Sequence, residues 1–179
     1  MWPAKIVARS DLTLRLVNQK HAAELFALVD AERGRLGKWL PWVDDTDGEA
    51  DVSAFISKAT AGVSQKTEVH YVICRRCSII GVVGFAEITS EGAGVLGYWL
   101  AERYEGGGVM LDSCRSLIEE AGRQGLTTIE IRCGAANLKS RAVAERLGFQ
   151  ASQFIPNAEC LRGASIDHVV FVMPCASAR

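Results

Sequence analysis

Three consecutive glycines, at positions 106–108, are the part of this 179-residue sequence best suited to binding chemistry. An apolar run from Val95 to Leu100 precedes them and predicts a strand. Behind them, apolar residues recur at the spacing of one helix face, at Met110, Cys114, Leu117, Ile118 and Ala121. A glycine loop at a helix start exposes unpaired N–H groups at the positive end of the helix dipole, and glycine lets an anion approach closely. The stretch predicts a phosphate or pyrophosphate site, with a plain tight connection as the alternative.

The residues around these glycines exclude two common phosphate-binding loops. A P-loop requires Gly-Lys followed by Ser or Thr, and here Val109 follows Gly108. The dinucleotide fingerprint G-x-G-x-x-G requires a third glycine where Leu111 stands. The pattern that does fit is Arg103-x-x-Gly106-x-Gly108, which is specific only in the right structural context.

Composition limits the class of protein. Hydrophobic residues make up 49% of the chain, charged residues 23%, and the net charge is −1 without any block of like charge. These values argue against nucleic acid or an anionic membrane surface as the main partner. No apolar run approaches the roughly 20 residues of a membrane span, and residues 1–5 lack the apolar core of a signal peptide. We therefore expect one domain spanning 1–179 and a cytoplasmic location.

Six cysteines give a weak metal or redox signal. A cytosolic protein usually keeps its cysteines as free thiols. Cys74 and Cys77 have CxxC spacing, but no second such pair exists, so no metal site is predicted. The pair separates two apolar runs, which predicts a hairpin turn at Arg75-Arg76, and a redox role for the two thiols is left open. Cys114 and Cys133 fall on apolar faces and are expected in the core.

Periodicity predicts the elements that position the glycine loop. Strands are expected at 12–16, 69–74, 78–86, 92–100, 128–133 and 167–173, with extended chain from Phe149 onward. Helices are expected at 21–29, 51–61, 109–123 and 137–147, the last capped by Asn137 and stopped by Gly148. The predicted fold class is α+β, with a mixed, mostly antiparallel central sheet and helices on both faces.

Trp39 and Trp42 bracket a Leu-Pro step between the first two predicted helices. Two roles stay open for them. Their chemistry alone favours a hydrophobic plug between helices. The other role is an aromatic wall of a substrate cleft, and in that role both are candidate substrate-binding residues.

The segment 134–149 contains Asn137, Ser140, Val143, Arg146 and the closing pair Gly148-Phe149. It resembles the N-x-x-S-x-x-(V/A)-x-x-(K/R)-x-G-F segment of the GNAT acyltransferases, and the glycine loop resembles their (Q/R)-x-x-G-x-(G/A) motif. Segments 36–42, 97–100, 158–162 and 167–169 are similar to the RimJ/RimL-like ribosomal-protein N-terminal acetyltransferases. The resemblance covers about residues 13–173 and is specific for acyl-CoA transfer, less so for the acceptor.

The resemblance implies acetyl-CoA as the acyl donor, lying between two strands that splay apart near Leu100 and Cys133. It implies contacts to the pantetheine arm from Trp99, Leu100, Ala101 and Asn137. Backbone N–H groups around the motif would hold the pyrophosphate, within the stretch Arg103, Tyr104, Glu105, Gly106, Gly107, Gly108, Val109 and Met110. The position between the two motif glycines is often basic in the family, whereas here it is Gly107.

The same resemblance assigns two catalytic candidates. Glu159 is the candidate base that accepts a proton from the amine, with a surface glutamate as the alternative. Ser140 is the candidate donor to the departing CoA sulfur, with helix capping as the alternative. Many GNAT enzymes use a tyrosine on this helix, and residues 137–149 contain none.

The resemblance implies an N-acetyltransferase acting on an amine. The expected acceptor is the N-terminal α-amine of a protein such as a ribosomal protein. A small-molecule amine, such as an antibiotic or an aminoacyl-nucleotide, is the alternative acceptor, and a non-catalytic acyl-CoA-binding regulator is the alternative class. No direct nucleic-acid or membrane partner is expected, and a homodimer is left open.

Overall fold

A single twisted sheet of eight strands positions the glycine loop in this computed structural model, which describes residues 1–175; residues 176–179 of the expected domain lie outside that range. The strand order is β1-β2-β3-β4-β5-β6-β8-β7. The strands are β1 (Lys5–Arg9), β2 (Leu12–Leu16), β3 (Val69–Arg75), β4 (Ser78–Ile88), β5 (Ala93–Leu100), β6 (Thr128–Gly134), β7 (Gln150–Leu161) and β8 (Ala164–Pro174). All neighbours pair antiparallel except β5 and β6, which are parallel.

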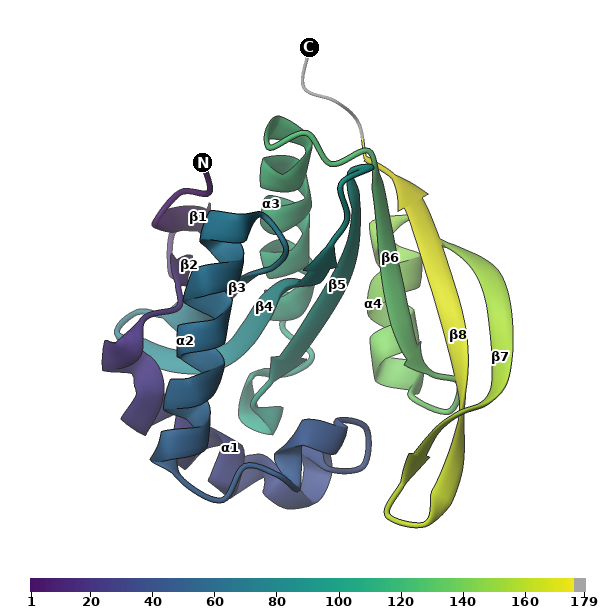
Figure 1. Cartoon of the computed structure of the whole chain (residues 1–179), viewed down its shortest axis with the longest axis horizontal. Coiled ribbons are helices and arrows are strands. Elements are labelled where there is room, and N and C mark those ends of the chain that lie inside the picture. The colour runs from purple at the N-terminus through teal and green to yellow at the C-terminus, as the bar shows by residue number, and fades with distance from the viewer. Residues whose placement is uncertain (176–179) are drawn as a thin grey trace.

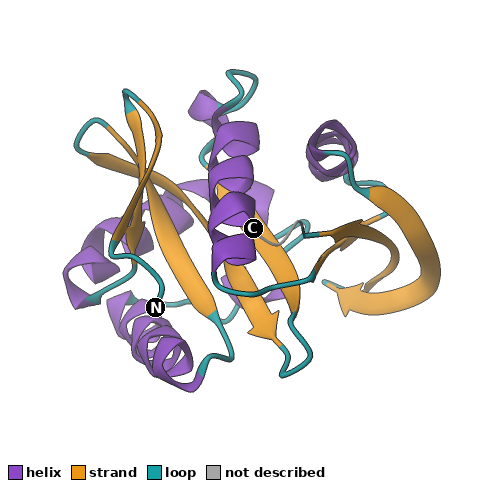
Figure 2. Ribbon diagram, turned by 90° about the horizontal axis from the view of Figure 1, so that it is seen from above, coloured by secondary structure: helices purple, strands orange, loops and turns teal. Residues whose placement is uncertain are grey.

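Four α-helices cover the two faces of the sheet in the described part of the chain, as Figures 1 and 2 show. The helices are α1 (Ala22–Leu36), α2 (Glu49–Gln65), α3 (Val109–Arg123) and α4 (Leu138–Leu147). Helices α1 and α2 lie on one face, and α3 and α4 lie on the other (Figure 1). The observed fold is the predicted α+β sheet with helices on both faces.

The period-two alternation of strand side chains explains how one sheet supports two cores. Along β3, Tyr71 and Ile73 join the cluster under α3 and α4. Their neighbours Val72 and Cys74 point the other way and join the cluster under α1 and α2. Strands β3 and β4 are therefore buried on both faces, which is why both are continuous apolar runs in the sequence.

The parallel pair β5 and β6 determines where a ligand can enter the sheet. Only Ala93–Val95 of β5 pair with Thr128–Glu130 of β6. Beyond these residues the two strands diverge, and Figure 1 shows them together at one end and apart at the other. Backbone groups on the facing edges past Val95 and Glu130 have no partner strand, although backbone donors and acceptors normally require partners. The predicted splaying of these strands is confirmed.

Most predicted elements are confirmed, including α3 from Val109 to Arg123 and the β3–β4 hairpin. Strand β1 was not predicted, and helices α1 and α2 extend beyond their predicted ends, to Leu36 and Gln65. Amphipathic helices continue as long as their buried face has a surface to cover, and sequence periodicity locates their ends poorly. Within residues 1–175 no helix is long and apolar enough to cross a membrane.

The CxxC segment forms the predicted hairpin turn. Arg76 lies in the left-handed region at φ +56°, and Cys74 is buried whereas Cys77 is exposed. Burial raises the pKa of the Cys74 thiol, because the thiolate would be poorly solvated there. No group of three or more His, Cys, Asp or Glu side chains among the described residues is arranged to hold a metal ion. Cys114 and Cys133 are buried, as expected.

Candidate acyl-transfer site

The glycine loop has the geometry that anion binding requires. Gly106 and Gly108 adopt left-handed φ values of +79° and +73°, which only glycine adopts without strain. Gly108 is the N-cap of α3, so the free N–H groups of that helix begin directly after it. A Cβ placed at Gly106 or Gly107 would meet no atom within 4 Å, so the loop surface is open to a ligand.

Arg9, the last residue of β1, forms hydrogen bonds to the glycine loop and to the first turn of α3. Its guanidinium donates to the carbonyl of Gly107 at 3.3 Å and to the carboxylate of Asp112 at 3.1 Å. It also pairs with Asp11 at 2.8 Å. Hydrogen bonds from Arg75 and then Arg9 lower the pKa of Asp11, so this support stays ionised at neutral pH. The unpredicted strand β1 thus has a role in fixing the loop.

The predicted cofactor residues at the end of β5 and in the segment that follows it differ in exposure. Leu100 and Ala101 are buried, and Trp99 is half-buried. The Arg103 guanidinium lies 4.9 Å from the ring centroid of Tyr104, a cation–π contact within the segment that precedes the glycines. Arg35 from α1 donates to the carbonyl of Leu100 at 2.5 Å and fixes the end of β5.

The first turn of α4 combines Asn137 and Ser140 as the sequence predicts. The Asn137 side chain accepts a hydrogen bond from the Ser140 N–H at 3.2 Å, which caps the helix. The Ser140 hydroxyl lies 3.1 Å from the Tyr98 hydroxyl, which also donates to the Ser140 carbonyl at 3.0 Å. Capping is therefore the structural role of Asn137, whereas the Ser140 side chain is turned to β5.

Tyr98 is absent from the predicted site residues, yet its phenol lies beside the predicted donor Ser140. Residues 137–149 contain no tyrosine, and β5 brings this phenol to within 3.1 Å of the Ser140 hydroxyl. Burial raises the pKa of Tyr98, so the phenol stays protonated at neutral pH. Burial also raises the pKa of the Cys133 thiol on the neighbouring strand β6. The available signal was the alternation of β5, which puts Tyr98 on the α3–α4 face with Leu96 and Leu100.

Glu159 lies beside His168, a residue without an assigned role in the sequence. Its carboxylate is 3.4 Å from His168 Nε2, and the two side chains are 30% and 22% exposed. Strand β7 bulges between Ile155 and Glu159. Within the bulge, Asn157 adopts φ +51° and its N–H donates to the Asp167 carboxylate at 2.8 Å. A bulge re-aims the side chains that follow it, and here it turns Glu159 toward β8.

The carboxyl end of β6 brings these groups together. Helix α4, which carries Ser140 in its first turn, begins four residues after Gly134. Gly134 pairs with His168, the partner of Glu159. A Cβ added at Gly134 would lie 3.1 Å from the Trp39 ring, so the absence of a side chain there admits Trp39 to the same end of the strand.

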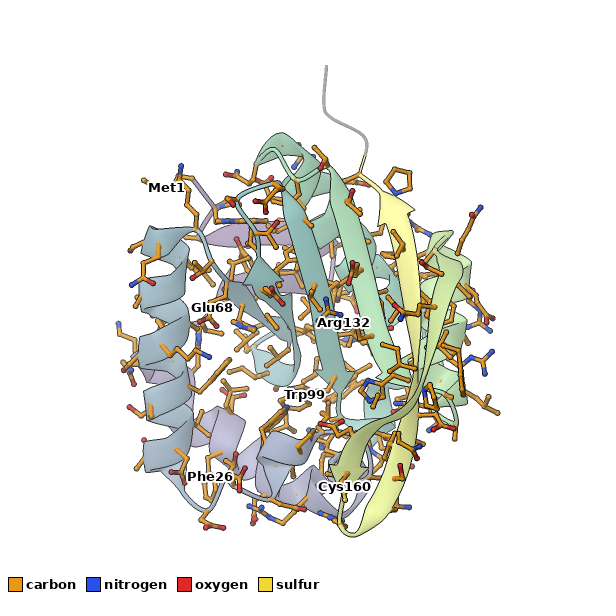
Figure 3. All side chains as sticks on the ribbon, turned by 45° about the vertical axis from the view of Figure 1, so that its right-hand side comes forward. Met1, Phe26, Glu68, Trp99, Arg132 and Cys160 are labelled. Atoms are coloured by element: carbon orange, nitrogen blue, oxygen red, sulfur yellow. The ribbon has the colours of Figure 1, made fainter. Side chains whose placement is uncertain are left out.

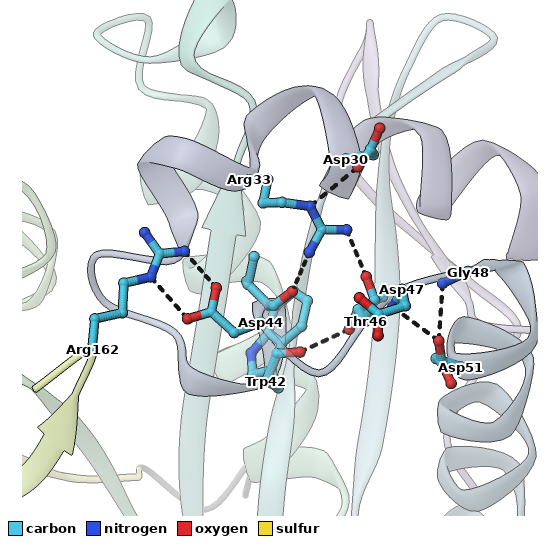
Figure 4. Close-up of polar contacts among 10 residues, drawn as sticks. Asp30, Arg33, Trp42, Asp44, Thr46, Asp47, Gly48, Asp51 and Arg162 are labelled. Carbon is cyan, nitrogen blue, oxygen red and sulfur yellow. Dashed lines mark hydrogen bonds and ion pairs between the residues drawn. The ribbon is translucent and has the colours of Figure 1, made fainter.

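Trp39 and Trp42 belong to the connection between α1 and α2, which Figure 4 shows as a folded loop. Arg33 holds it by donating to the carbonyls of Val43 and Thr46, both at 2.6 Å. The Asp44 carboxylate pairs with Arg162 at the tip of the β7–β8 hairpin. Figure 3 shows this hairpin, with Cys160 labelled, beside the loop, and Trp99 above it. The pair ties the loop to the strand that carries Glu159.

The exposure of Trp42 bears on one of its two possible roles, the hydrophobic plug. Its side chain is 39% exposed, and its ring centroid lies 6.2 Å from that of Trp99 with a tilt of 48°. A buried plug is therefore wrong for Trp42. Trp39 is half-buried against Gly134. Both tryptophans border the wide end of the divergence between β5 and β6.

Comparison with known proteins gives this arrangement a family. The sequence model of a family described as "Acetyltransferase (GNAT) domain" matches residues 11–150. The chain is 31% identical over 161 residues to the putative ribosomal N-acetyltransferase YdaF of Bacillus subtilis, covering 83% of this chain and 82% of that protein. It is 27% identical to the ribosomal-protein-serine acetyltransferase of Escherichia coli, covering 90% and 92%.

Solved structures are similar over nearly the whole chain. RimL, a ribosomal L7/L12 α-N-protein acetyltransferase in complex with coenzyme A, superposes with a TM-score of 0.95 at 25% identity, covering 97% of this chain and 99% of that one. The microcin C7 self-immunity acetyltransferase MccE, in complex with acetyl-CoA and AMP, gives 0.91 at 27% identity and covers 97% of both chains. The glycine loop, the diverging strands and these matches agree: the chain belongs to the GNAT acetyltransferase family.

Proposed function

We propose that this protein transfers the acetyl group of acetyl-CoA to the N-terminal α-amine of a protein, with a ribosomal protein as the leading acceptor. The observation that carries the proposal is the end of β6, where the strand diverges from β5 on one edge and pairs with His168, the neighbour of Glu159, on the other. The names of the bacterial relatives and of RimL support the acceptor class.

The chain's own groups fit acetyl-CoA. The edges of β5 and β6 past Val95 and Glu130 offer backbone donors and acceptors to an amide-containing arm such as pantetheine. The glycines and the first turn of α3 offer N–H groups to a pyrophosphate. Asn137 and residues 99–101 are the candidates to contact the pantetheine arm between the two. When bound, the donor supplies a thioester whose carbonyl is open to attack by an amine.

The acceptor amine must be neutral to attack. An α-amino group has a pKa near 7.7–8.0, whereas a lysine amine is near 10.4, so an N-terminus needs only a modest base. Glu159 serves as that base, directly or through water, and passes the proton toward solvent. The new bond forms between nitrogen and the acetyl carbon, the carbon–sulfur bond breaks, and the CoA sulfur leaves as a thiolate or thiol. Ser140 donates a hydrogen bond to that sulfur.

Replacement of Ser140 by Ala should lower kcat about tenfold at every pH between 7 and 9. The effect should be modest because a thiol of pKa near 8.5 leaves with little assistance. The fold should persist, because Tyr98 keeps the Ser140 carbonyl as its acceptor and the loss is about 1 kcal/mol. Profiles of kcat against pH measure the loss of rate, and a thermal melt measures the loss of stability. An unchanged kcat would remove Ser140 from the reaction.

The proposal is tested by following CoA release with a thiol reagent while acetyl-CoA is offered with a panel of acceptors. The panel holds peptides with free N-termini beginning with Ser or Ala, the same peptides N-terminally blocked but carrying lysine, and small amines. Turnover on free N-termini alone supports the proposal. Turnover on lysine or small amines alone contradicts it, and CoA binding without turnover on any acceptor identifies a regulator.

A small-molecule amine is the second candidate acceptor, and one observation favours it. The exposed Trp42 packs against the half-buried Trp99, and a flat ring stacks well on such an aromatic surface. MccE, a structural neighbour over the whole chain, is in complex with AMP as well as acetyl-CoA. An aminoacyl-nucleotide in the acceptor panel tests this reading directly.

Replacement of Trp42 by Ala should raise the acceptor KM about tenfold and leave acetyl-CoA affinity unchanged, because a stacked aromatic contact contributes about 1–1.5 kcal/mol. Little stability should be lost, since the side chain is already 39% exposed. Trp39→Ala is the comparison variant: it uncovers Gly134 and should lower Tm as well. A large drop in Tm with an unchanged KM for Trp42→Ala would assign Trp42 to packing.

A further inference from the structure

A chain of charges crosses the wide end of the gap between β5 and β6. The loop that follows β5 and the first turn of α4, which follows β6, stand on its two sides. The Glu105 carboxylate accepts Arg35 from α1 at 2.8 Å and also pairs with Lys139 from α4. One carboxylate therefore connects three segments at the place where the acyl donor should enter.

The two cations on Glu105 differ in how firmly they are held. Arg35 is 26% exposed, pairs with Glu32 at 2.8 Å and also donates to the carbonyl of Leu100. Lys139 is 71% exposed, and Glu105 is its one ion-pair partner among residues 1–175. Exposed lysine pairs contribute little because solvent screens them and the long stem loses freedom. The Lys139 contact is thus the exchangeable one.

The position of Glu105 is unusual for a phosphate site. It directly precedes Gly106, so a carboxylate belongs to the same loop as the N–H groups that should receive two phosphates. Like charges within one loop repel unless cations neutralise them. The loop itself carries Gly107 where a basic residue would otherwise contribute, and the Arg103 guanidinium stacks on Tyr104. Lys139 is the cation on the other side of the gap that can reach this loop.

We propose that Glu105 holds Lys139 across the entrance in the free protein, and that Lys139 moves to the pyrophosphate of the incoming acyl donor. This inference rests on the proposed function, because it assigns a residue to the binding of acetyl-CoA. Arg35 stays on Glu105 and neutralises its carboxylate during the exchange. The ion pair between Glu105 and Lys139 holds the lysine until the pyrophosphate, a stronger acceptor with two charges, binds.

The experiment measures binding by calorimetry, without turnover, for CoA, dephospho-CoA and pantetheine. Lys139→Gln should weaken CoA and dephospho-CoA about tenfold and leave pantetheine unaffected, because only the first two carry the pyrophosphate. Glu105→Gln should tighten CoA about threefold at low salt by releasing Lys139, and this gain should vanish in the double variant. Higher salt should reduce the loss in Lys139→Gln, since an exposed charge is screened.

Lys20→Gln, which changes an exposed lysine of the short helix 19–21, is the matched control and should bind like the original protein. Glutamine favours helix as well as lysine does, so α4 should persist in Lys139→Gln, and circular dichroism checks this. Equal CoA affinity in Lys139→Gln and the original protein overturns the inference. A loss confined to CoA and absent for dephospho-CoA also overturns it, because the lysine would then serve the 3′-phosphate. Failure of the original protein to bind CoA would instead contradict the proposed function.

Discussion

Replacement of Glu159 by Gln should lower kcat/KM at pH 7 by about 10²–10⁴, the usual contribution of a positioned general base. The substitution keeps the shape of the side chain and an oxygen that can accept from His168, but removes the basicity. The loss should shrink as the pH rises past about 8, because the free α-amine then forms without help. Initial rates from pH 6 to 9.5 on an N-terminal peptide measure both the loss and the recovery.

The matched control is Glu119→Gln, which neutralises an exposed glutamate on α3 and should leave the rate unchanged. CoA affinity should be equal in both variants, because Glu159 lies on β7 and not on the cofactor loop. If Glu159→Gln has the original kcat/KM at pH 7, no base acts at this position. The enzyme would then work by holding amine and thioester together, which alone supplies several kcal/mol.

Replacement of Gly108 by Val should reduce CoA affinity at least about 100-fold. At φ +73° a β-branched residue is strained, so the loop must leave this conformation and the first N–H groups of α3 turn away from the anion. Each charge-assisted hydrogen bond lost costs about 1.5–3 kcal/mol, and about 2.7 kcal/mol corresponds to 100-fold. Calorimetric titration with CoA measures the change.

Gly107→Ala separates backbone conformation from side-chain bulk. Gly107 has no left-handed φ, and a Cβ there meets no atom within 4 Å, so this neighbour should tolerate the methyl group and bind CoA almost normally. Circular dichroism and a melt establish that both variants are folded. Normal CoA binding by a folded Gly108→Val protein would place the pyrophosphate site elsewhere.

Local signals account for what could be predicted from the residues alone. Helix α3 begins and ends where predicted because a glycine N-cap and an apolar stripe mark it within one short stretch. Asn137 caps α4 and Gly148 ends it at φ +93°, both from contacts within a few residues. Strand β1 was not predicted because Lys5–Arg9 is short and its three central apolar residues do not alternate with polar ones. Pairing with β2 and the hydrogen bond of Arg9 to the glycine loop hold this strand in position.

The alternatives left open for single residues needed contacts between distant segments. The Leu-Pro step before Trp42 is compatible with both a hydrophobic plug and an aromatic wall of a cleft. The exposure of Trp42 depends on its place in the tertiary structure, beside Trp99, which is 57 residues away in the chain. Tyr98 was overlooked because its contact with Ser140 joins a strand to a helix 42 residues later. The partnership of Glu159 with His168 depends on a bulge, which shifts the register of one strand against another.

The sequence by itself determined the family, the glycine loop and the order of the elements, because these reside in short-range spacing: residue type, helix period and caps. Tertiary structure alone decided what meets at the end of β6. Two parallel strands pair over three residues and then diverge. Contacts between distant segments bring Trp39 to Gly134, Glu159 to His168 and Lys139 to Glu105. Side chains that share a site in this way share no local pattern, since their distances are set by sheet order and packing, which act between residues far apart in the chain.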